Sequence, residues 1–227
     1  MNEKSIDRSR SLLVLRGVSK HWPRRPEPVL DGVNLDVAPG NVVAVRGRNG
    51  AGKTTLLRIA AGMLTADAGE VEIGGVTPDA DRRAFQRRIG YVSAGNGALY
   101  ARLSVDRHLA LWSRLAMLRR DDHARAAAAV RSAFALDELR GQRVDRLSAG
   151  QRQRLRLALG FMHQPEVVLL DEPENSLDEE AAALLARALE AVKGRGGGAL
   201  VCSPSGSGSL LPVDDEVTVS DGRLVRA

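Results

Sequence analysis

The sequence predicts an α/β fold with a mostly parallel sheet at its core, a small antiparallel β layer and an α-helical subdomain. Strand patterns come first along the chain, an alternation of helices and strands follows, and a stretch at approximately 95–150 is all helical. We expect a single domain over residues 12–227 that contains this helical subdomain. Residues 1–11 are polar and predict a disordered tail.

The predicted strands are short and are separated by glycine-containing turns. Residues 12–18 and 33–37 alternate apolar and polar side chains, which is typical of half-buried strands. Short apolar runs predict further strands over residues 42–45, 70–73, 89–92, 167–170, 199–202, 217–219 and 224–225. Gly74-Gly75 predicts a turn, and Asp221-Gly222 between the last two strands indicates a hairpin.

Helical patterns occupy the remaining long stretches. A helix is expected over residues 53–61, directly after a glycine-rich loop. The pattern is helical from 104 to 134, where the apolar residues Val105, Leu109, Trp112 and Leu115 recur at helical spacing. Two more helices are predicted over residues 151–162 and 181–192.

The composition excludes several functional classes. The 227 residues are 44% hydrophobic and 27% charged, as in ordinary globular domains, and only 3% aromatic, so the stacking platforms of single-strand nucleic-acid binders are missing. The net charge of +5 comes from scattered residues, which favours a solvated surface over a nucleic-acid site. One cysteine permits no intrachain disulfide, and no apolar run approaches the ~18 residues of a membrane span. Any role at a membrane is therefore expected at its surface, through a partner.

A phosphate-binding loop is predicted at Gly47-Arg48-Asn49-Gly50-Ala51-Gly52-Lys53-Thr54, which matches G-x-x-x-x-G-K-[ST]. Glycines let consecutive backbone amides cradle phosphate oxygens, and the following helix presents the positive end of its dipole. Lys53 would reach the β- and γ-phosphates of ATP, and the Thr54 hydroxyl would bind Mg²⁺. The alternative, a plain glycine-rich turn, does not account for the apolar strand before the loop and the helix after it. The nucleotide contacts expected here are Gly47, Asn49, Gly50, Ala51, Gly52, Lys53, Thr54 and Thr55.

An acidic pair follows the buried strand predicted at 167–170. Asp171 lies at the end of this strand, where a carboxylate is able to hold the hydration shell of Mg²⁺. Glu172 beside it is the candidate general base that polarises the attacking water. An acidic turn after a strand is common by itself, and it is the phosphate-binding loop upstream that favours the catalytic interpretation.

Leu147-Ser148-Ala149-Gly150-Gln151 precedes an arginine-rich helix and resembles the L-S-G-G-Q-type motif of ABC transporter ATP-binding subunits, which are P-loop ATPases. Together with the two motifs above, the resemblance, exporter-like in character, extends from about Leu12 to Val225. It implies that ATP joins two subunits head to tail, as a homodimer or a heterodimer. The further binding residues that it implies are Ser148, Gly150 and Gln151 on the other subunit's γ-phosphate, Asp178 at the dimer contact and Trp22 stacked on adenine.

The chain departs from this family at two positions. The family has a Gln after the strand at 89–92, where this chain has Ser93-Ala94-Gly95-Asn96-Gly97, and Asn96 is the candidate substitute. The family also has a His after the strand that ends at Cys202, where this chain continues Ser203-Pro204-Ser205. Both departures predict slow ATP hydrolysis by the isolated subunit.

The function that the resemblance implies is the ATP-hydrolysing motor of a membrane transporter, bound to the cytoplasmic face of the membrane through an integral membrane subunit. The segment 99–105 resembles the partner-docking segment of exporter-type subunits. The membrane subunit is therefore expected to dock around 93–103 and the helical subdomain. Two alternatives stay open. One is a soluble ABC ATPase that acts on ribosomes or DNA, although this chain has a single phosphate-binding loop. The other is an ATP-gated dimerisation module with negligible hydrolysis.

Overall fold

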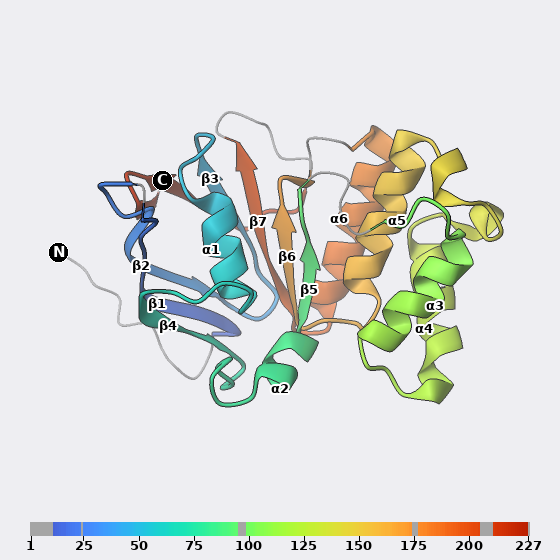
Figure 1. The fold of residues 1–227 in the computed structure, drawn as a ribbon, viewed down its shortest axis with the longest axis horizontal. Coiled ribbons are helices and arrows are strands. Elements are labelled where there is room, and N and C mark those ends of the chain that lie inside the picture. Colours follow the sequence, from blue (N-terminus) through green and yellow to red (C-terminus); the bar gives the residue numbers. More distant parts are fainter. Residues whose placement is uncertain (1–10, 24, 95–98, 174–176, 205–210, 227) are drawn as a thin grey trace.

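The computed structural model describes residues 11–23, 25–94, 99–173, 177–204 and 211–226. The tail predicted over 1–11 therefore lies outside the described residues except for Ser11. Two sheets share one helix between them, and a group of helices lies beyond the larger sheet (Figure 1). The predicted α/β class with a helical subdomain is confirmed.

The larger sheet has six strands in the order β5-β6-β7-β3-β8-β9. All neighbours are parallel except the last pair, which forms the predicted hairpin with both turn residues, Asp221 and Gly222, at positive φ. The strands span β3 Val42–Gly47, β5 Ile89–Val92, β6 Val167–Asp171, β7 Gly198–Pro204, β8 Asp215–Ser220 and β9 Arg223–Arg226. The central strands β3 and β6 are buried along their whole length, as parallel strands covered on both faces must be.

The smaller sheet is antiparallel, with β1 in the middle of the order β2-β1-β4. Its strands span β1 Leu13–Lys20, β2 Leu30–Val37 and β4 Ala68–Ile73. Leu15 pairs with Leu35 on one side and with Val71 on the other, so the inward positions of the three strands are in register. This sheet is the predicted antiparallel layer, and the turn after it has both Gly74 and Gly75 at positive φ.

Helix α1 (Lys53–Ala60) lies between the two sheets and joins them into one core (Figure 1). Its Leu56 and Leu57 are fully buried, among apolar side chains from both sheets. The helix begins directly after β3 and the glycine-rich loop. The core therefore holds the start of this helix, with Lys53 and Thr54, rigidly against the parallel sheet.

The helical subdomain packs on the other face of the parallel sheet and has its own apolar core, which includes Leu109, Phe134 and Leu155. Its helices are α3 Val105–Leu115, α4 His123–Ala133 and α5 Ala149–Phe161, with α6 Glu179–Gly194 beside them, and short 3-10 turns at Arg120–Asp122, Asp137–Leu139 and Val144–Arg146. The helical pattern predicted over 104–134 is broken after Leu115. Met117 takes a left-handed φ of 54°, and the amide of Leu118 donates to the Ser113 carbonyl, which ends α3.

Helix α2 (Arg82–Arg87) was not predicted. The sequence there contains pairs of arginines, which indicate a solvent-exposed surface and not a particular secondary structure. Two features form the helix: Asp81 caps it by accepting from the Ala84 amide, and Phe85 is fully buried. A single apolar residue in six gives no periodicity, so pattern analysis misses a helix this short.

Candidate nucleotide-binding site

The site lies where the parallel strands end. Strands β3, β6 and β7 run side by side in the same direction, so the residues that follow each strand meet at one edge of the sheet (Figure 1). The glycine-rich loop follows β3, and the acidic pair closes β6. Residues more than a hundred positions apart are thereby brought into contact.

The backbone requires glycine at one point of the loop and leaves little room for a side chain at another. Gly52 has a φ of 108°, and a Cβ there would lie 2.8 Å from the Val29 carbonyl oxygen. A Cβ on Gly47 would lie 3.0 Å from the Val219 carbonyl oxygen. Gly50 also has a positive φ, of 81°. The loop therefore keeps a tight, side-chain-free curvature that leaves its amides accessible to phosphate oxygens.

Lys53 is folded back over the loop. Its side chain is 4% exposed, and Nζ donates to the carbonyl oxygens of Gly47 at 2.9 Å and Arg48 at 3.2 Å. Nζ also lies 3.6 Å from Oε1 of Glu172. The ammonium group is thus held at the centre of the loop, beside the acidic pair, as the motif predicts.

Thr54 and Asp171, the two residues expected to bind the metal ion, lie in contact with each other. The Thr54 hydroxyl donates to Oδ1 of Asp171 at 3.1 Å. Asp171 is 2% exposed, and this burial raises its pKa, against the lowering effect of the Thr54 hydrogen bond. One hydroxyl and one carboxylate form the oxygen donor set that Mg²⁺ takes together with phosphate and water, so the residues present fit this ion.

Glu172 is held in an uncommon backbone conformation. Its φ is 47°, in the left-handed region, and its amide donates to the Cys202 carbonyl at 2.8 Å. Such a conformation costs on the order of 1–3 kcal/mol for a residue other than glycine. The β6–β7 pairing maintains it, and the carboxylate is thereby turned toward Lys53, with 23% of the side chain exposed.

Lys53, Thr54 and Glu172 line one cavity of about 340 Å³. It is lined by Trp22, Arg25, Val29, Asn49, Gly50, Gly52, Lys53, Thr54, Thr55 and Glu172. Trp22 is 40% exposed at its rim, and the Lys20 ammonium lies 5.6 Å from the centre of its ring. Most of the predicted binding residues are therefore gathered around one hollow, with an aromatic face at its end.

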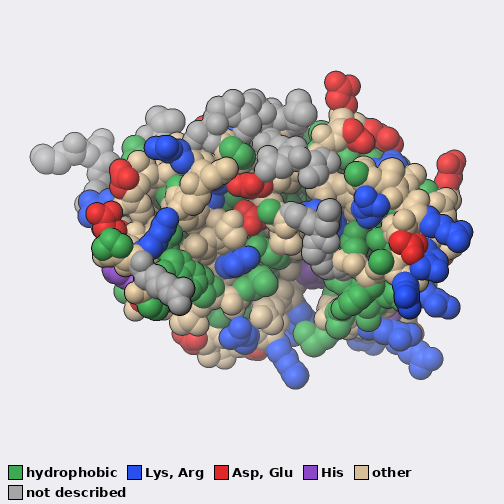
Figure 2. All heavy atoms as spheres, turned by 45° about the horizontal axis from the view of Figure 1, so that its top comes forward, with side chains coloured by type: hydrophobic (Ala, Val, Ile, Leu, Met, Phe, Trp, Pro, Cys, Tyr) green, Lys and Arg blue, Asp and Glu red, His purple; other side chains and the backbone are tan. Residues whose placement is uncertain are grey.

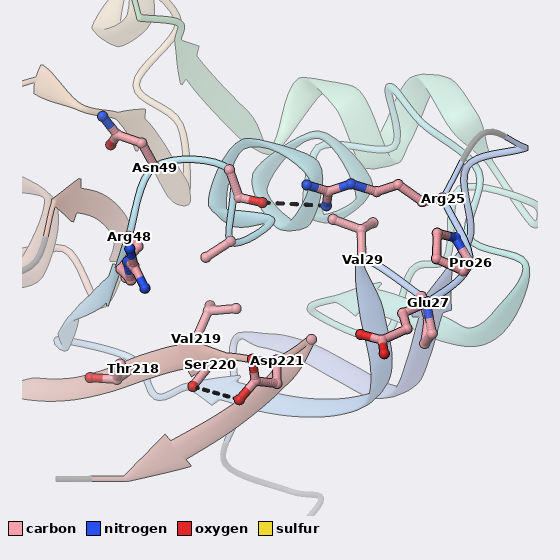
Figure 3. Close-up of a pocket in the computed structure, with 15 residues that line it drawn as sticks. Arg25, Pro26, Glu27, Val29, Arg48, Asn49, Thr218, Val219, Ser220 and Asp221 are labelled. Atoms are coloured by element: carbon pink, nitrogen blue, oxygen red, sulfur yellow. Dashed lines mark hydrogen bonds between the residues drawn. The ribbon is translucent and has the colours of Figure 1, made fainter.

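A second, larger cavity of about 760 Å³ lies on the other side of the glycine-rich loop (Figure 3). It is bounded by residues 25–29, the loop itself and the 218–222 hairpin. Arg25 points across it and donates weakly to the Gly50 carbonyl, at 3.5 Å. Sequence reasoning missed both Arg25 and the hairpin. Nothing in the sequence links them to the loop: the pairing of β8 with β3 brings the hairpin there, and Arg25 comes from the connection between β1 and β2.

The residues expected to act on the other subunit's nucleotide form a separate group at the start of α5. Ser148 caps this helix by accepting from the Gln151 amide at 3.2 Å, and the Gln151 side chain accepts from the Ser148 amide at 2.9 Å. A Cβ on Gly150 would lie 2.7 Å from Oδ2 of Asp178, which itself caps α6 through the Ala181 amide. None of these residues lines the cavity that contains Lys53.

Several predicted positions fall outside the described residues. They include Asn96, the candidate substitute for the family's Gln, as well as Asn175, Ser176 and the segment from Ser205 to Ser209. Ser203, the first residue after Cys202, is described. Its hydroxyl is buried and has no hydrogen-bond partner within the part of the chain that the structure covers.

Comparison with known proteins gives consistent matches. The ABC transporter family model matches residues 30–175. The lipoprotein-releasing system ATP-binding protein LolD 1 of Rhodopirellula baltica is 32% identical over 222 residues, which cover 95% of this chain and 96% of that protein. The cytochrome c biogenesis ATP-binding export protein CcmA of Roseobacter denitrificans is 38% identical over 176 residues, covering 78% of this chain and 77% of that protein.

Solved structures share the fold. An ATP-binding subunit of an ABC transporter matches with a TM-score of 0.84 and 24% identity, over 95% of this chain and 90% of that chain. A dimeric ATP-binding cassette in a post-hydrolysis state, bound to ADP and Pi, matches with a TM-score of 0.81 and 22% identity, over 94% and 97%. From the family match and the near full-length similarity to LolD 1, this chain belongs to the ABC transporter family and is one of its ATP-binding ATPase subunits.

Proposed function

We propose that this chain is the motor subunit of an ABC-type membrane transporter and that it hydrolyses Mg-ATP in the cavity around Lys53. The observation that carries the proposal is the convergence of Lys53, Thr54, Asp171 and Glu172 at one edge of the parallel sheet. Each of these side chains is of the type that phosphoryl transfer needs at its place.

In this proposal the loop amides from Gly50 to Thr55 and the Lys53 ammonium bind the triphosphate. Trp22 at the rim of the cavity supplies the flat face on which adenine stacks. Thr54 and Asp171 would hold Mg²⁺, which when bound neutralises charge on the β- and γ-phosphate oxygens. Lys53 already has its ammonium fixed by two carbonyl groups, so little ordering is needed when ATP binds.

Glu172 is the proposed general base. Its carboxylate would accept a proton from water while the water oxygen forms a bond to the γ-phosphorus and the bond from that phosphorus to the β–γ bridging oxygen breaks. The Lys53 ammonium lies 3.6 Å from Oε1 of this carboxylate and directs it toward the loop. The products are ADP and phosphate.

Hydrolysis by the isolated subunit is proposed to be slow. In this proposal the segments 93–97 and 203–208 lack the Gln and the His that the family pattern has there, so two side chains that would order water and stabilise charge are missing. The loss of one such contact commonly lowers the rate by ~10²-fold or more. A complete second site on a partner subunit would restore turnover to the pair.

A second subunit is part of the proposal because the chain carries two separate groups of nucleotide-binding residues, which we call half-sites. One is the cavity around Lys53, and the other is the start of α5. The start of α5, with Ser148, Gly150 and Gln151, presents a helix N-terminus suited to phosphate, yet it does not line the cavity around Lys53. A head-to-tail pair would place this group of each subunit on the ATP of the other, and Asp178 near the contact.

The membrane partner is proposed to dock on the helical subdomain. Tyr100 is 58% exposed and Leu115 is 61% exposed, so the surface around α3 offers apolar contacts. Basic side chains are dispersed over the face shown in Figure 2, with acidic ones among them, which does not suggest a nucleic-acid stripe. No helix within the described residues is long and apolar enough to cross a membrane. Docking on this partner would give the chain a peripheral position on the cytoplasmic face of the membrane.

The test is nucleotide binding and turnover by the purified chain. We expect Mg-ATP to bind the wild type and Glu172→Gln about equally and to bind Lys53→Ala at least ~10-fold more weakly, because a charged phosphate contact is lost. Wild type should release phosphate slowly, and Glu172→Gln should release none above background. Equal affinity of Lys53→Ala and wild type would contradict the proposal.

The alternative of an ATP-gated module is favoured by the two departures from the family pattern. In that case wild type and Glu172→Gln would both bind ATP, and both would release phosphate at the background rate. The same pair of proteins therefore separates the two functions.

A further inference from the structure

Arg156 is a buried cation that the site described above does not use. It lies in the middle of α5 and is 6% exposed. Its Nη2 donates to the Ser93 carbonyl oxygen at 2.5 Å, and within the described residues no carboxylate forms an ion pair with it. Burial lowers the pKa of its guanidinium. Arg154, one half-turn earlier, differs in this respect because its Nη1 lies 2.7 Å from Oε1 of Glu180.

The hydrogen bond of Arg156 links two parts of the proposed machinery. Ser93 follows β5, whose last residue Val92 pairs with Leu170, so Ser93 is level with Asp171 on the neighbouring strand. Arg156 lies eight positions after Ser148, at the start of the same helix, which is about 12 Å along the helix axis. The hydrogen bond of the guanidinium therefore connects α5, whose start carries Ser148, to Ser93. Ser93 leaves the sheet beside Asp171, the proposed metal ligand.

A buried guanidinium that has no ion-pair partner among the described residues is unfavourable for stability at this position. Removing such a charge from water costs several kcal/mol, and a single carbonyl acceptor offsets only part of that cost. An unbranched apolar side chain would fill similar volume without this penalty. Stability alone therefore does not explain why the chain has an arginine here.

We propose that Arg156 is a positioning residue for ATP hydrolysis. By holding the Ser93 carbonyl against α5, it keeps the exit of β5 in register with the acidic pair. This inference rests on the proposed function.

The test compares Arg156→Met and Arg156→Lys with wild type in steady-state hydrolysis of Mg-ATP by the full chain. We expect Arg156→Met to lower kcat by ~10-fold or more and to leave KM within about twofold, because positioning is lost and the nucleotide cradle is untouched. Its melting temperature should not fall, since a buried charge has been removed. Arg154→Met is the matched control on the same helix and should keep the wild-type kcat.

Arg156→Lys supplies a readout that a purely structural role would not affect. A buried lysine has a lowered pKa, so its charge is lost at alkaline pH, whereas arginine stays protonated. Arg156→Lys should retain part of kcat near neutral pH and lose it as pH rises, relative to wild type at each pH. A pH-independent ratio, or a full kcat in Arg156→Met beside an active wild type, overturns this inference alone. A wild-type rate equal to that of Glu172→Gln overturns the proposed hydrolysis and this inference with it.

Discussion

At the scale of single residues, the site contains two groups whose conformation or burial destabilises the ligand-free fold. Glu172 has a left-handed φ of 47°, and Asp171 is a carboxylate with 2% exposure. Neither arrangement favours folding in the ligand-free chain. Both become favourable when a cation and a phosphate chain occupy the cavity, which is the pattern expected of a site shaped for its ligand.

Asp171→Asn should therefore stabilise the ligand-free protein. Burial raises the pKa of Asp171, so the ionised form present at neutral pH is the form that the fold disfavours. Asn keeps an oxygen that accepts from Thr54 and has no charge to bury. We expect a melting temperature about 2–4 °C above wild type without ligand, which corresponds to ~1 kcal/mol in a chain of this size.

Addition of Mg-ATP should reverse that order. It should raise the melting temperature of wild type more than that of Asp171→Asn, because the variant binds Mg²⁺ more weakly. A ligand-free variant that melts below wild type would show that the carboxylate is stabilising without metal.

At the scale of elements, α3 is fixed at its start by a neutral histidine. His108 is fully buried, its Nε2 accepts from the Tyr100 amide at 2.8 Å, and its Nδ1 lies 3.2 Å from the Ser104 carbonyl oxygen. These partners require a proton on Nδ1 and none on Nε2. The imidazole thereby holds the segment that presents Tyr100, on the proposed docking surface.

Acid should loosen this arrangement. Burial lowers the pKa of His108, against a smaller raising effect of its bond to Ser104, so the neutral form favours folding. A lowered folded-state pKa means that this contribution is complete above about pH 6.5 and is lost as pH falls through the folded-state value. Melting temperatures measured from pH 7.5 to 5 should fall less for His108→Gln than for wild type, because Gln has no proton to gain. The same decline in both proteins would contradict the assignment.

At the scale of the whole molecule, the two half-sites predict an ATP-dependent pair. Glu172→Gln with ATP should elute at about twice the 24.3 kDa mass of the chain, since uncleaved ATP would stay between the subunits. Without ATP the same variant should elute as a monomer. Light scattering coupled to gel filtration measures this directly. Lys53→Ala in the same background is the control and should stay monomeric with ATP.

Strand and helix patterns predicted most of the fold. The parallel strands, the antiparallel layer, α1 and the Asp221-Gly222 hairpin all follow from local patterns and were confirmed. Helix α2 was missed because it buries only Phe85, and the break after Leu115 was missed because Met117 is not a residue that sequence analysis places at positive φ.

The sequence by itself determined the chemistry of the nucleotide site, because the motifs fix residue types whose roles depend on local backbone geometry. Gly52 needs its positive φ, Lys53 lies within reach of its own loop, and Ser148 caps its own helix. Only the tertiary structure decided which distant groups meet. Asp171 reaches Thr54, Arg156 reaches Ser93, and the 218–222 hairpin walls the larger cavity, because strand order in a sheet is set by packing of the whole core.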